Sequence, residues 1–380
     1  MKRRVNTVVC RFIHGESTRR RAGRWATPVA LVILLGCFLW THTLADSHSP
    51  RQSVLRVLAW PGYADDDWVH AFEKRFHAKV EVTLVDSDEA LWARMHSAAP
   101  PPFDVLAANT AEIARYAQAG MLTALDLSRI PNRRWQQPYF QRLADIRGLV
   151  DAGHAYAIPF TYSSMGLIYD RKQIPVPPRS MRVLWDPRYR GKVLDFNSAQ
   201  HNFSFTALAL GYRDPFHLTP GQTRVVAREL VRLRRNLLTY YTLPEEATAQ
   251  FVQHHVALMF GNYGTQQVEQ LRAAGVDVGY VIPDEGALAW LDCWAITRNA
   301  NNPALAYDWI NAMLEPALGK QLTQREGLAN TMTPVSGDVS TVASGAGPRL
   351  VWIQPVESIG EREALWHRIE AGDRLRSFAP

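Results

Sequence analysis

A tryptophan and an aspartate two residues apart, inside an otherwise apolar segment, have the right chemistry for a cation-binding site. The segment EGALAWLDCWAI covers residues 285–296. In an extended strand alternate side chains share a face, so Leu288, Trp290, Asp292 and Trp294 are expected on one side. A carboxylate there is costly to bury without a partner, whereas a bound cation would gain from the charge and the indole faces. The same aspartate could instead reach water or accept backbone hydrogen bonds at a strand end, so this segment leaves both interpretations open.

Other chemistry has little support among the sequence motifs. The 380 residues contain no GxSxG elbow, HExxH, P-loop or dinucleotide fingerprint, so we expect no enzyme, no catalytic residues and no cofactor. The adjacent His254 and His255 point two ways on any regular element and make a poor metal chelate. Tyr240 and Tyr241 could hold ferric iron, although adjacent tyrosines are more often ordinary packing. A ferric-ion receptor therefore stays open as an alternative, and otherwise no bound metal is expected.

The charge of the chain is concentrated at its N-terminus. The formal net charge is +6, with 42 basic and 36 acidic residues. Residues 1–50 contain eight of the basic and two of the acidic residues, which leaves 34 of each kind in 51–380. Because the rest of the chain is neutral, we expect no nucleic-acid partner.

The N-terminal segment has the pattern of an export signal. A basic region ends at Arg24, and an apolar run from Ala26 to Trp40 follows, shorter than the ~20 residues of a membrane span. Small residues favour cleavage after Ala45, which would export the remainder. Lipoprotein processing at Cys37 and an uncleaved membrane anchor remain open. The cysteine beyond the segment, Cys293, has no partner for an internal disulfide and is expected to be core packing.

Strand and helix patterns alternate along the exported chain. Strands are expected at 54–60, 80–85, 104–108, 165–170, 256–260 and 278–282, and helices at 65–76, 202–210, 219–233 and 303–325. Asp86 with Glu89 suggests a capping box, and Thr110 suggests a second helix cap. Trp60 and Tyr63 follow the first strand, where ligands gather in open α/β sheets. The pattern predicts two α/β lobes of ~100–150 residues, with largely parallel sheets.

Several segments together resemble the periplasmic polyamine-binding proteins, the spermidine- and putrescine-binding components of ABC importers. They are VLAWPGYADDDWVHAFEKRF, FDVLAANTAEIARYAQAGML, AIPFTYSSMGLIYD, LWDPRYRGKVL and the Trp290 segment with ITRNANNPALAYDWINAML. The resemblance covers residues 54–372. It implies the α/β, two-lobed periplasmic-binding-protein fold (type II-like), with a ligand cleft between the lobes and closure by hinge motion. It also implies a periplasmic monomer that binds a small cationic, polyamine-like ligand and docks on the importer's membrane subunits.

The resemblance also divides the chain. The expected parts are an export signal or membrane anchor at 1–45, lobe 1 at 53–158 plus 297–345, lobe 2 at 159–296, and a segment at 346–380 that crosses back over the lobes. Crossovers between the lobes are expected near Pro159 and Ile296. If the N-terminal segment is retained, a membrane-anchored ligand sensor becomes a further alternative.

The resemblance implies a site in which aromatic rings sandwich the methylenes of the ligand and carboxylates bind its ammonium groups. The matching positions are Trp60, Tyr63, Asn109 (or Thr110), Phe260, Trp290 and Asp292, with Gln354 as the amide of the C-terminal segment. Asp292 matches the central ammonium ligand.

Two positions depart from the family pattern. Ser198 and His201 stand where the family supplies two more acidic residues, and the nearby Asp195 could face the core. An unpaired ammonium in a dry cleft is costly. The ligand could therefore have a single strong cationic end, or carry an anionic group that meets protonated His201. It could also be a diamine that binds weakly or with waters filling in.

Overall fold

The computed structural model describes residues 53–97, 102–332 and 349–374, and residues 52–380 form one compact unit. The predictions about the export signal, cleavage after Ala45 and Cys37 lie outside the described residues. Within the described ranges, no helix combines the length and the apolar character that a membrane span requires.

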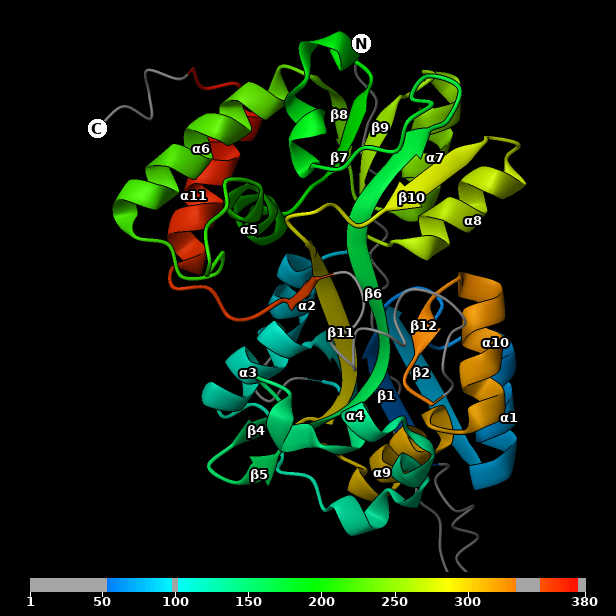
Figure 1. Cartoon of the computed structure of the whole chain (residues 1–380). Helices are drawn as coiled ribbons and strands as arrows, with labels where there is room; N and C mark the ends of the chain where they lie inside the picture. The colour runs from blue at the N-terminus through cyan, green and yellow to red at the C-terminus, as the bar shows by residue number, and fades with distance from the viewer. Residues whose placement is uncertain (1–52, 98–101, 333–348, 375–380) are drawn as a thin grey trace, which may run out of the picture. The chain divides into compact units, whose positions relative to one another are not determined.

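Strands from the whole length of the unit join one hydrogen-bonded network (Figure 1). Its strands are β1 Ser53–Ala59, β2 Ala78–Leu84, β3 Val105–Asn109, β6 Ala157–Asp170, β7 Val193–Phe196, β8 Leu237–Tyr241, β9 Leu258–Gly261, β10 Val278–Val281, β11 Ala287–Ile296, β12 Ala329–Asn330 and β13 Leu350–Trp352. A small hairpin pairs β4 Val150–Asp151 with β5 His154–Ala155.

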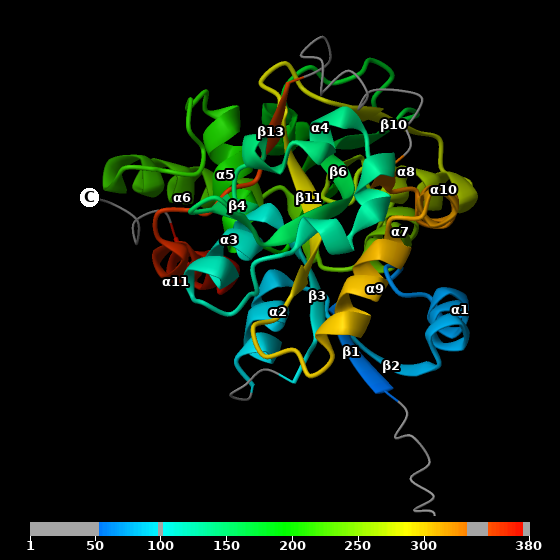
Figure 2. The same cartoon turned by 90° about the horizontal axis from the view of Figure 1, so that it is seen from below.

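Helices cover these strands. They are α1 Asp66–Phe76, α2 Asp88–Met95, α3 Thr110–Gln118, α4 Pro138–Gln141, α5 Ala199–Ala209, α6 Pro220–Arg234, α7 Pro244–Gln253, α8 Thr265–Ala273, α9 Pro303–Met313, α10 Pro316–Glu326 and α11 Ile359–Glu370. Figure 2 shows α2 and α3 on one side of β3, and α9 and α1 on the other. The expected single helix over 303–325 is two helices, because Pro316 starts a new one after Met313.

The strand order is β2-β1-β3-β11-β6-β9-β7-β8, with β10 and β12 also paired to β6 and β13 paired to β11. The outer pairs β1–β2, β1–β3, β7–β8 and β7–β9 are parallel, whereas β11 runs antiparallel to both β3 and β6. The parallel strands fall into two groups, one in each lobe, and the antiparallel strands join them. The α/β, two-lobed fold class is confirmed.

The long strand β6 passes from one lobe to the other. It has 14 residues and begins at Ala157, well before the strand expected at 165–170. Its first half pairs with β11 and β12, and the stretch from Gly166 onward pairs with β9. The change of partner thus lies later than Pro159. At the other expected crossover, Ile296 pairs with Val105 of β3, inside the sheet of the first lobe. The residue boundaries of the lobes stay a prediction, with strand pairing favouring a later crossing in β6 and an earlier one in β11.

Two helix caps differ from the sequence prediction by one residue. Ser87, not Asp86, caps α2, and its hydroxyl accepts from a backbone N–H in the first turn. Asn109, not Thr110, caps α3, since its Oδ1 accepts from two backbone N–H groups in the first turn of that helix. The expected cap of α6 is confirmed, because Thr219 forms a reciprocal capping box with the third residue of the helix. These caps matter because α2 and α3 begin next to the cavity described below.

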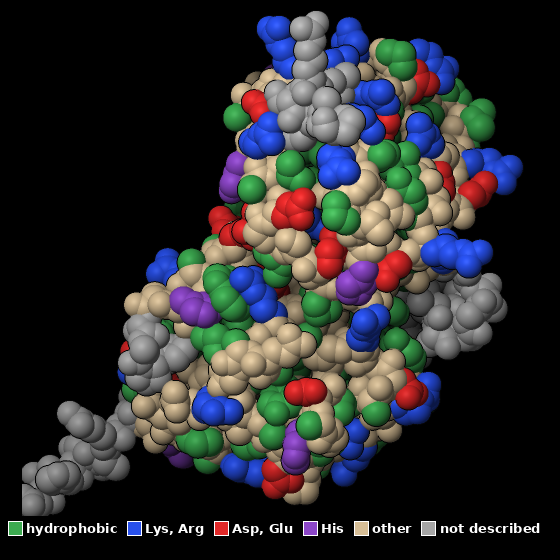
Figure 3. Space-filling view, turned by 90° about the vertical axis from the view of Figure 1, so that its left-hand side faces the viewer, with side chains coloured by type: hydrophobic (Ala, Val, Ile, Leu, Met, Phe, Trp, Pro, Cys, Tyr) green, Lys and Arg blue, Asp and Glu red, His purple; other side chains and the backbone are tan. Residues whose placement is uncertain are grey.

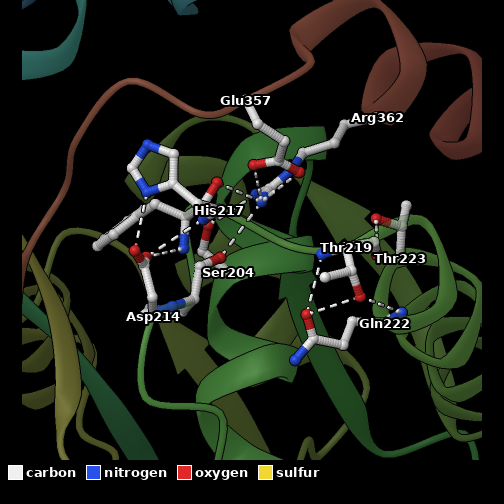
Figure 4. A network of polar contacts seen from close by, with 10 residues as sticks. Ser204, Asp214, His217, Thr219, Gln222, Thr223, Glu357 and Arg362 are labelled. Carbon is white, nitrogen blue, oxygen red and sulfur yellow. Dashed lines mark hydrogen bonds and ion pairs between the residues drawn. The ribbon is translucent and has the colours of Figure 1, made fainter.

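A buried arginine fixes the C-terminal segment to the second lobe (Figure 4). The Arg362 side chain is fully buried. Its guanidinium donates to Ser204 Oγ at 2.9 Å and to the Phe216 carbonyl at 2.9 Å, and it pairs with Glu357 at 3.2 Å. Because β13 also pairs with β11, residues 350–370 contact strands and helices from both parts of the unit.

Candidate functional site

A cavity of about 880 Å³, part of it open to solvent, lies at the junction of the two lobes. Its walls come from the ends of β1 and β3, the middle of β11, the segment before α2, and the starts of α5, α7 and α8. Seven predicted residues line it: Trp60, Tyr63, Asn109, Ser198, His201, Trp290 and Asp292. Positions that are up to 232 residues apart in the chain therefore meet at one site, as expected for a ligand cleft.

Asp292 is the most deeply placed carboxylate of the cavity, with 7% of its surface exposed. Tyr63 donates its hydroxyl hydrogen to Asp292 Oδ2 at 2.7 Å. Burial raises the pKa of Asp292 to about 7, and the hydrogen bond from Tyr63 offsets this only in part. Burial and the neighbouring carboxylate raise the pKa of Tyr63 well above its ordinary value, so the phenol stays a neutral donor. In the described chain, Asp292 thus has a side-chain partner rather than the backbone N–H partners of the alternative interpretation.

The indole rings of the cavity come from Trp60 and Trp290. Trp290 donates its Nε1 hydrogen to the Asn262 carbonyl at 2.8 Å, which fixes the ring orientation. The expectation that Trp294 forms the second indole wall is wrong. Trp294 is fully buried outside the cavity, with its ring 5.5 Å from Phe160 and 5.8 Å from Trp309. Beyond Asp292 the strand enters the core under α9, so Trp294 shares the face of Asp292 but not its surroundings.

Ser198 and His201 lie at the start of α5 on the opposite wall. Ser198 is the N-cap of α5, and its Oγ accepts from the His201 N–H at 3.4 Å. His201 Nδ1 lies 3.0 Å from Asn262 Oδ1, an acceptor that this nitrogen reaches by donating. Burial lowers the pKa of His201 to about 4. His201 is therefore neutral near pH 7 in the ligand-free protein, which does not favour the alternative in which its imidazolium meets an anionic ligand group.

Asn109 uses its side chain twice. Its Oδ1 caps α3, and its Nδ2 donates to both carboxylate oxygens of Asp88, at 2.9 and 3.1 Å. The alternative residue Thr110 does not line the cavity, and its hydroxyl donates to the Ile353 carbonyl at 3.1 Å. Asn109 thus connects the first-lobe sheet to a carboxylate that the sequence prediction did not include.

Two predicted site residues lie away from the cavity. Phe260 is fully buried and stacks on Phe205 at 4.4 Å, and Asn262 just beyond β9 lines the wall instead. Gln354 accepts from Arg147 Nη1 at 2.6 Å, whereas its neighbour Ile353 lines the cavity. For Gln354, an error of one residue along an extended segment selects the opposite face. Phe260 lies inside β9, which ends at Gly261, whereas Asn262 lies beyond the end of this strand.

Asp195 and Cys293 behave as core residues. Asp195 is fully buried, its Oδ1 accepts from the Phe196 N–H at 2.9 Å, and burial raises its pKa. Cys293 is fully buried too, and burial raises the pKa of its thiol. Neither side chain lines the cavity.

Five carboxylates of the cavity were missed by sequence reasoning: Asp86, Asp88, Glu89, Glu245 and Glu326. Together with Asp292 they make six acidic side chains, and none of the described lining residues is Lys or Arg. The rule that identified Trp60 could have found Asp86 and Asp88, because they follow β2, which pairs in parallel with β1. Glu326 gave no such signal, since the start of α8 approaches it only in the folded chain, where Gln266 donates to it at 3.2 Å.

The tyrosine pair is not arranged for iron. Tyr241 donates its hydroxyl hydrogen to the Phe260 carbonyl at 2.6 Å, and the ring of Tyr240 packs at 5.1 Å against Trp366. Neither tyrosine lines the cavity. The described residues also contain no group of three or more His, Cys, Asp or Glu side chains placed to hold a metal ion. The ferric-ion alternative therefore lacks its expected ligands.

Comparisons with known proteins, by sequence and by structure, find solute-binding proteins. A family profile, "Bacterial extracellular solute-binding protein", matches residues 67–344. The spermidine/putrescine-binding periplasmic protein 1 of Haemophilus influenzae is 26% identical over 281 residues, covering 73% of this chain and 75% of the relative. The spermidine/putrescine-binding periplasmic protein of Escherichia coli is 24% identical over 285 residues, covering 75% and 79%. A solved structure from Listeria monocytogenes, named as a spermidine/putrescine ABC transporter, aligns with a TM-score of 0.70 at 20% identity, covering 86% and 99% of the two chains.

Proposed function

The chain belongs to the bacterial extracellular solute-binding proteins, and on this premise we propose that it binds a polyamine or related small amine for an ABC importer. The names of its relatives suggest the amine, and the cavity supports it. The observation that carries the proposal is a lining of six carboxylates and two indole rings, with no Lys or Arg among the described lining residues. Such a lining attracts a small cation and repels an anion.

The proposed binding mode follows from the geometry around Asp292. An ammonium group pairs with the Asp292 carboxylate, while the faces of Trp60 and Trp290 contact the methylenes next to it. Tyr63 stays neutral and keeps its hydrogen bond to Oδ2, which holds the carboxylate in place. Because the pKa of Asp292 is about 7 in the free protein, binding of a cation near neutral pH releases part of a proton.

We also propose that the lobes close around the ligand by bending in β6 and β11. The start of α8 contacts the end of α10 next to the cavity: Gln266 donates to Glu326, and Thr265 donates its hydroxyl hydrogen to the Gly327 carbonyl at 2.6 Å. These contacts join residues of the two proposed lobes. They would break if the lobes separated, so they help to hold a closed form.

The remaining parts of the proposal concern the setting of the protein. The chain acts as a monomer in the periplasm, performs no chemical reaction and delivers its ligand to the membrane subunits of the importer. Its relatives are named as binding proteins, and the sequence contains none of the nucleophile or metal motifs of common hydrolases.

A thermal-shift screen tests the proposed function. Putrescine, spermidine, amino acids and ferric salts are added separately to the purified protein, and the melting temperature is measured. We expect putrescine or spermidine to raise the melting temperature by mass action, and the Asp292→Asn variant to lose this shift. An amino acid or ferric salt that raises it while amines do not would overturn the proposal.

A further inference from the structure

The cavity holds negative charge on a wall that the sequence prediction did not consider. Position 198 is a neutral serine and His201 is neutral near pH 7, so the start of α5 offers no charge to a second ammonium group. The facing segment at the start of α2 carries Asp88. We propose that Asp88 binds the second ammonium group of the ligand, while Asp292 binds the first. This inference rests on the proposed function and names the residue that takes the place of the missing acidic side chains at positions 198 and 201.

The Asp88 carboxylate is fixed in direction but lacks a cation. It is the first residue of α2, its side chain is half-buried, and both of its oxygens accept hydrogen bonds from the neutral Asn109 amide. No described Lys or Arg forms an ion pair with it. The nearby Arg115 is used elsewhere, since it pairs with Glu112 at 3.5 Å and lies 3.3 Å from the centre of the Trp92 ring.

The electrostatic surroundings of Asp88 are unfavourable without a bound cation. Burial, followed by the charges of Glu112, Glu89 and Asp292, raises the pKa of Asp88 well above its ordinary value. Asn109 connects the two carboxylates, because its amide donates to Asp88 and its strand position pairs with Asp292, and both carboxylates line the cavity. A folded protein gains stability by pairing or removing such charges, and carboxylates that stay unpaired in a cleft are typical of binding sites. A ligand with two positive groups would relieve both charges.

The shape of the cleft fits an extended ligand with Asp88 along its length. A second hollow of about 1060 Å³, also partly open to solvent, shares Ser87, Asp88, Glu89 and Ser198 with the first cavity. It continues outward between α2 and α11, where Glu363, Glu370, His367 and Arg115 line it. Figure 3 views the side of the molecule that lies on the left in Figure 1, where α11 is found, and shows several acidic and histidine side chains at mid-height. Asp88 therefore lines both hollows, whereas Asp292 lines only the first.

The test separates the second charge from the first by comparing two amines of equal chain length. Putrescine has an ammonium group at each end, and n-butylamine has one. Both are titrated calorimetrically into wild-type protein and into the Asp88→Asn variant. Asparagine keeps an oxygen for the Asn109 amide and removes a repelling charge, so the variant is expected to fold. Asp66→Asn is the matched control, because Asp66 is the first residue of α1, is exposed and does not line the cavity.

Asp88→Asn is expected to weaken putrescine binding about tenfold or more and to leave n-butylamine binding unchanged within about twofold. Asp66→Asn should change neither. Unchanged putrescine affinity in Asp88→Asn, or an equal loss for both amines, would overturn the role of Asp88 while leaving amine binding intact. If neither amine nor spermidine binds the wild-type protein, the proposed function itself fails, and with it this inference.

Discussion

Replacing Asp292 by asparagine should make the ligand-free protein more stable, although it removes the charge that we propose binds the ligand. The structure sets the size of the effect: the pKa of Asp292 is raised from 3.8 to about 7, chiefly by burial. A raised carboxyl pKa means that the folded state holds a proton that the unfolded state has lost. The free energy of unfolding therefore falls as the pH rises from about 4 to about 7. At about 1.4 kcal/mol for each pKa unit, the buried charge costs up to about 4 kcal/mol above pH 7.

The asparagine side chain of the variant cannot ionise, so the stabilisation of the variant should depend on pH. Urea unfolding at pH 5 and pH 8, without ligand, measures the difference in unfolding free energy between variant and wild type. The gain should be about 1.7 kcal/mol at pH 5, where part of the unfolded-state carboxyl has already ionised, and reach about 4 kcal/mol at pH 8. His201 titrates in both proteins alike, so its contribution cancels in the difference. A variant that is less stable than wild type at pH 8, or a difference that does not change with pH, would refute the reasoning about Asp292.

Three further outcomes are expected. The affinity of wild-type protein for putrescine should rise about tenfold from pH 6 to pH 8, because the carboxylate of Asp292 ionises around pH 7 while the amines stay charged. Titration calorimetry of wild type and Asp292→Asn at both pH values checks this. An equal change of affinity with pH in the two proteins would contradict it. Trp290→Ala should weaken putrescine binding by about 1–2 kcal/mol through lost cation–π contact, whereas Trp135→Ala, at a half-exposed position outside the cavity, should not. Arg362→Met should lower the free energy of unfolding by about 3 kcal/mol, because it leaves the Phe216 carbonyl and Glu357 without their buried partner. Urea unfolding measures this loss, with Arg224→Met on the exposed face of α6 as the control. Equal losses in the two variants would show that the contacts of Arg362 do not stabilise the fold.

Local periodicity was enough to predict most of the elements. The strands β1, β2 and β3 and the helix α1 lie within one or two residues of their predicted ranges, because alternation and amphipathic spacing are properties of short segments. Thr219 as a helix cap, followed by Pro220 in the first turn, likewise predicted the start of α6. Only the end of the strand β6 was predicted, at 165–170, since a strand buried on both faces shows no alternation along its length.

The site could be predicted only where a strand end or the family resemblance pointed to it. Trp60, Tyr63 and Asp292 lie at the cavity as expected. Trp294 was misplaced because its surroundings depend on where β11 enters the core under α9, which no local pattern records. Asp86 and Glu89 were interpreted as a helix cap, and Asp88 between them was not considered. The place of Asp88 near Asp292 arises from the packing of α2 against β3 through Asn109. Such contacts between distant segments are set by the fold as a whole.

One calorimetric experiment tests most directly whether the cavity is a cation site built around Asp292. Putrescine is titrated into the ligand-free protein at pH 7 in two buffers that differ in their enthalpy of ionisation. We predict binding of one putrescine per chain, with release to the buffer of about half a proton from Asp292 and a further share from Asp88, whose pKa is also raised by burial. Absence of binding, or binding heat that is the same in both buffers, would contradict a central role for Asp292 in cation binding.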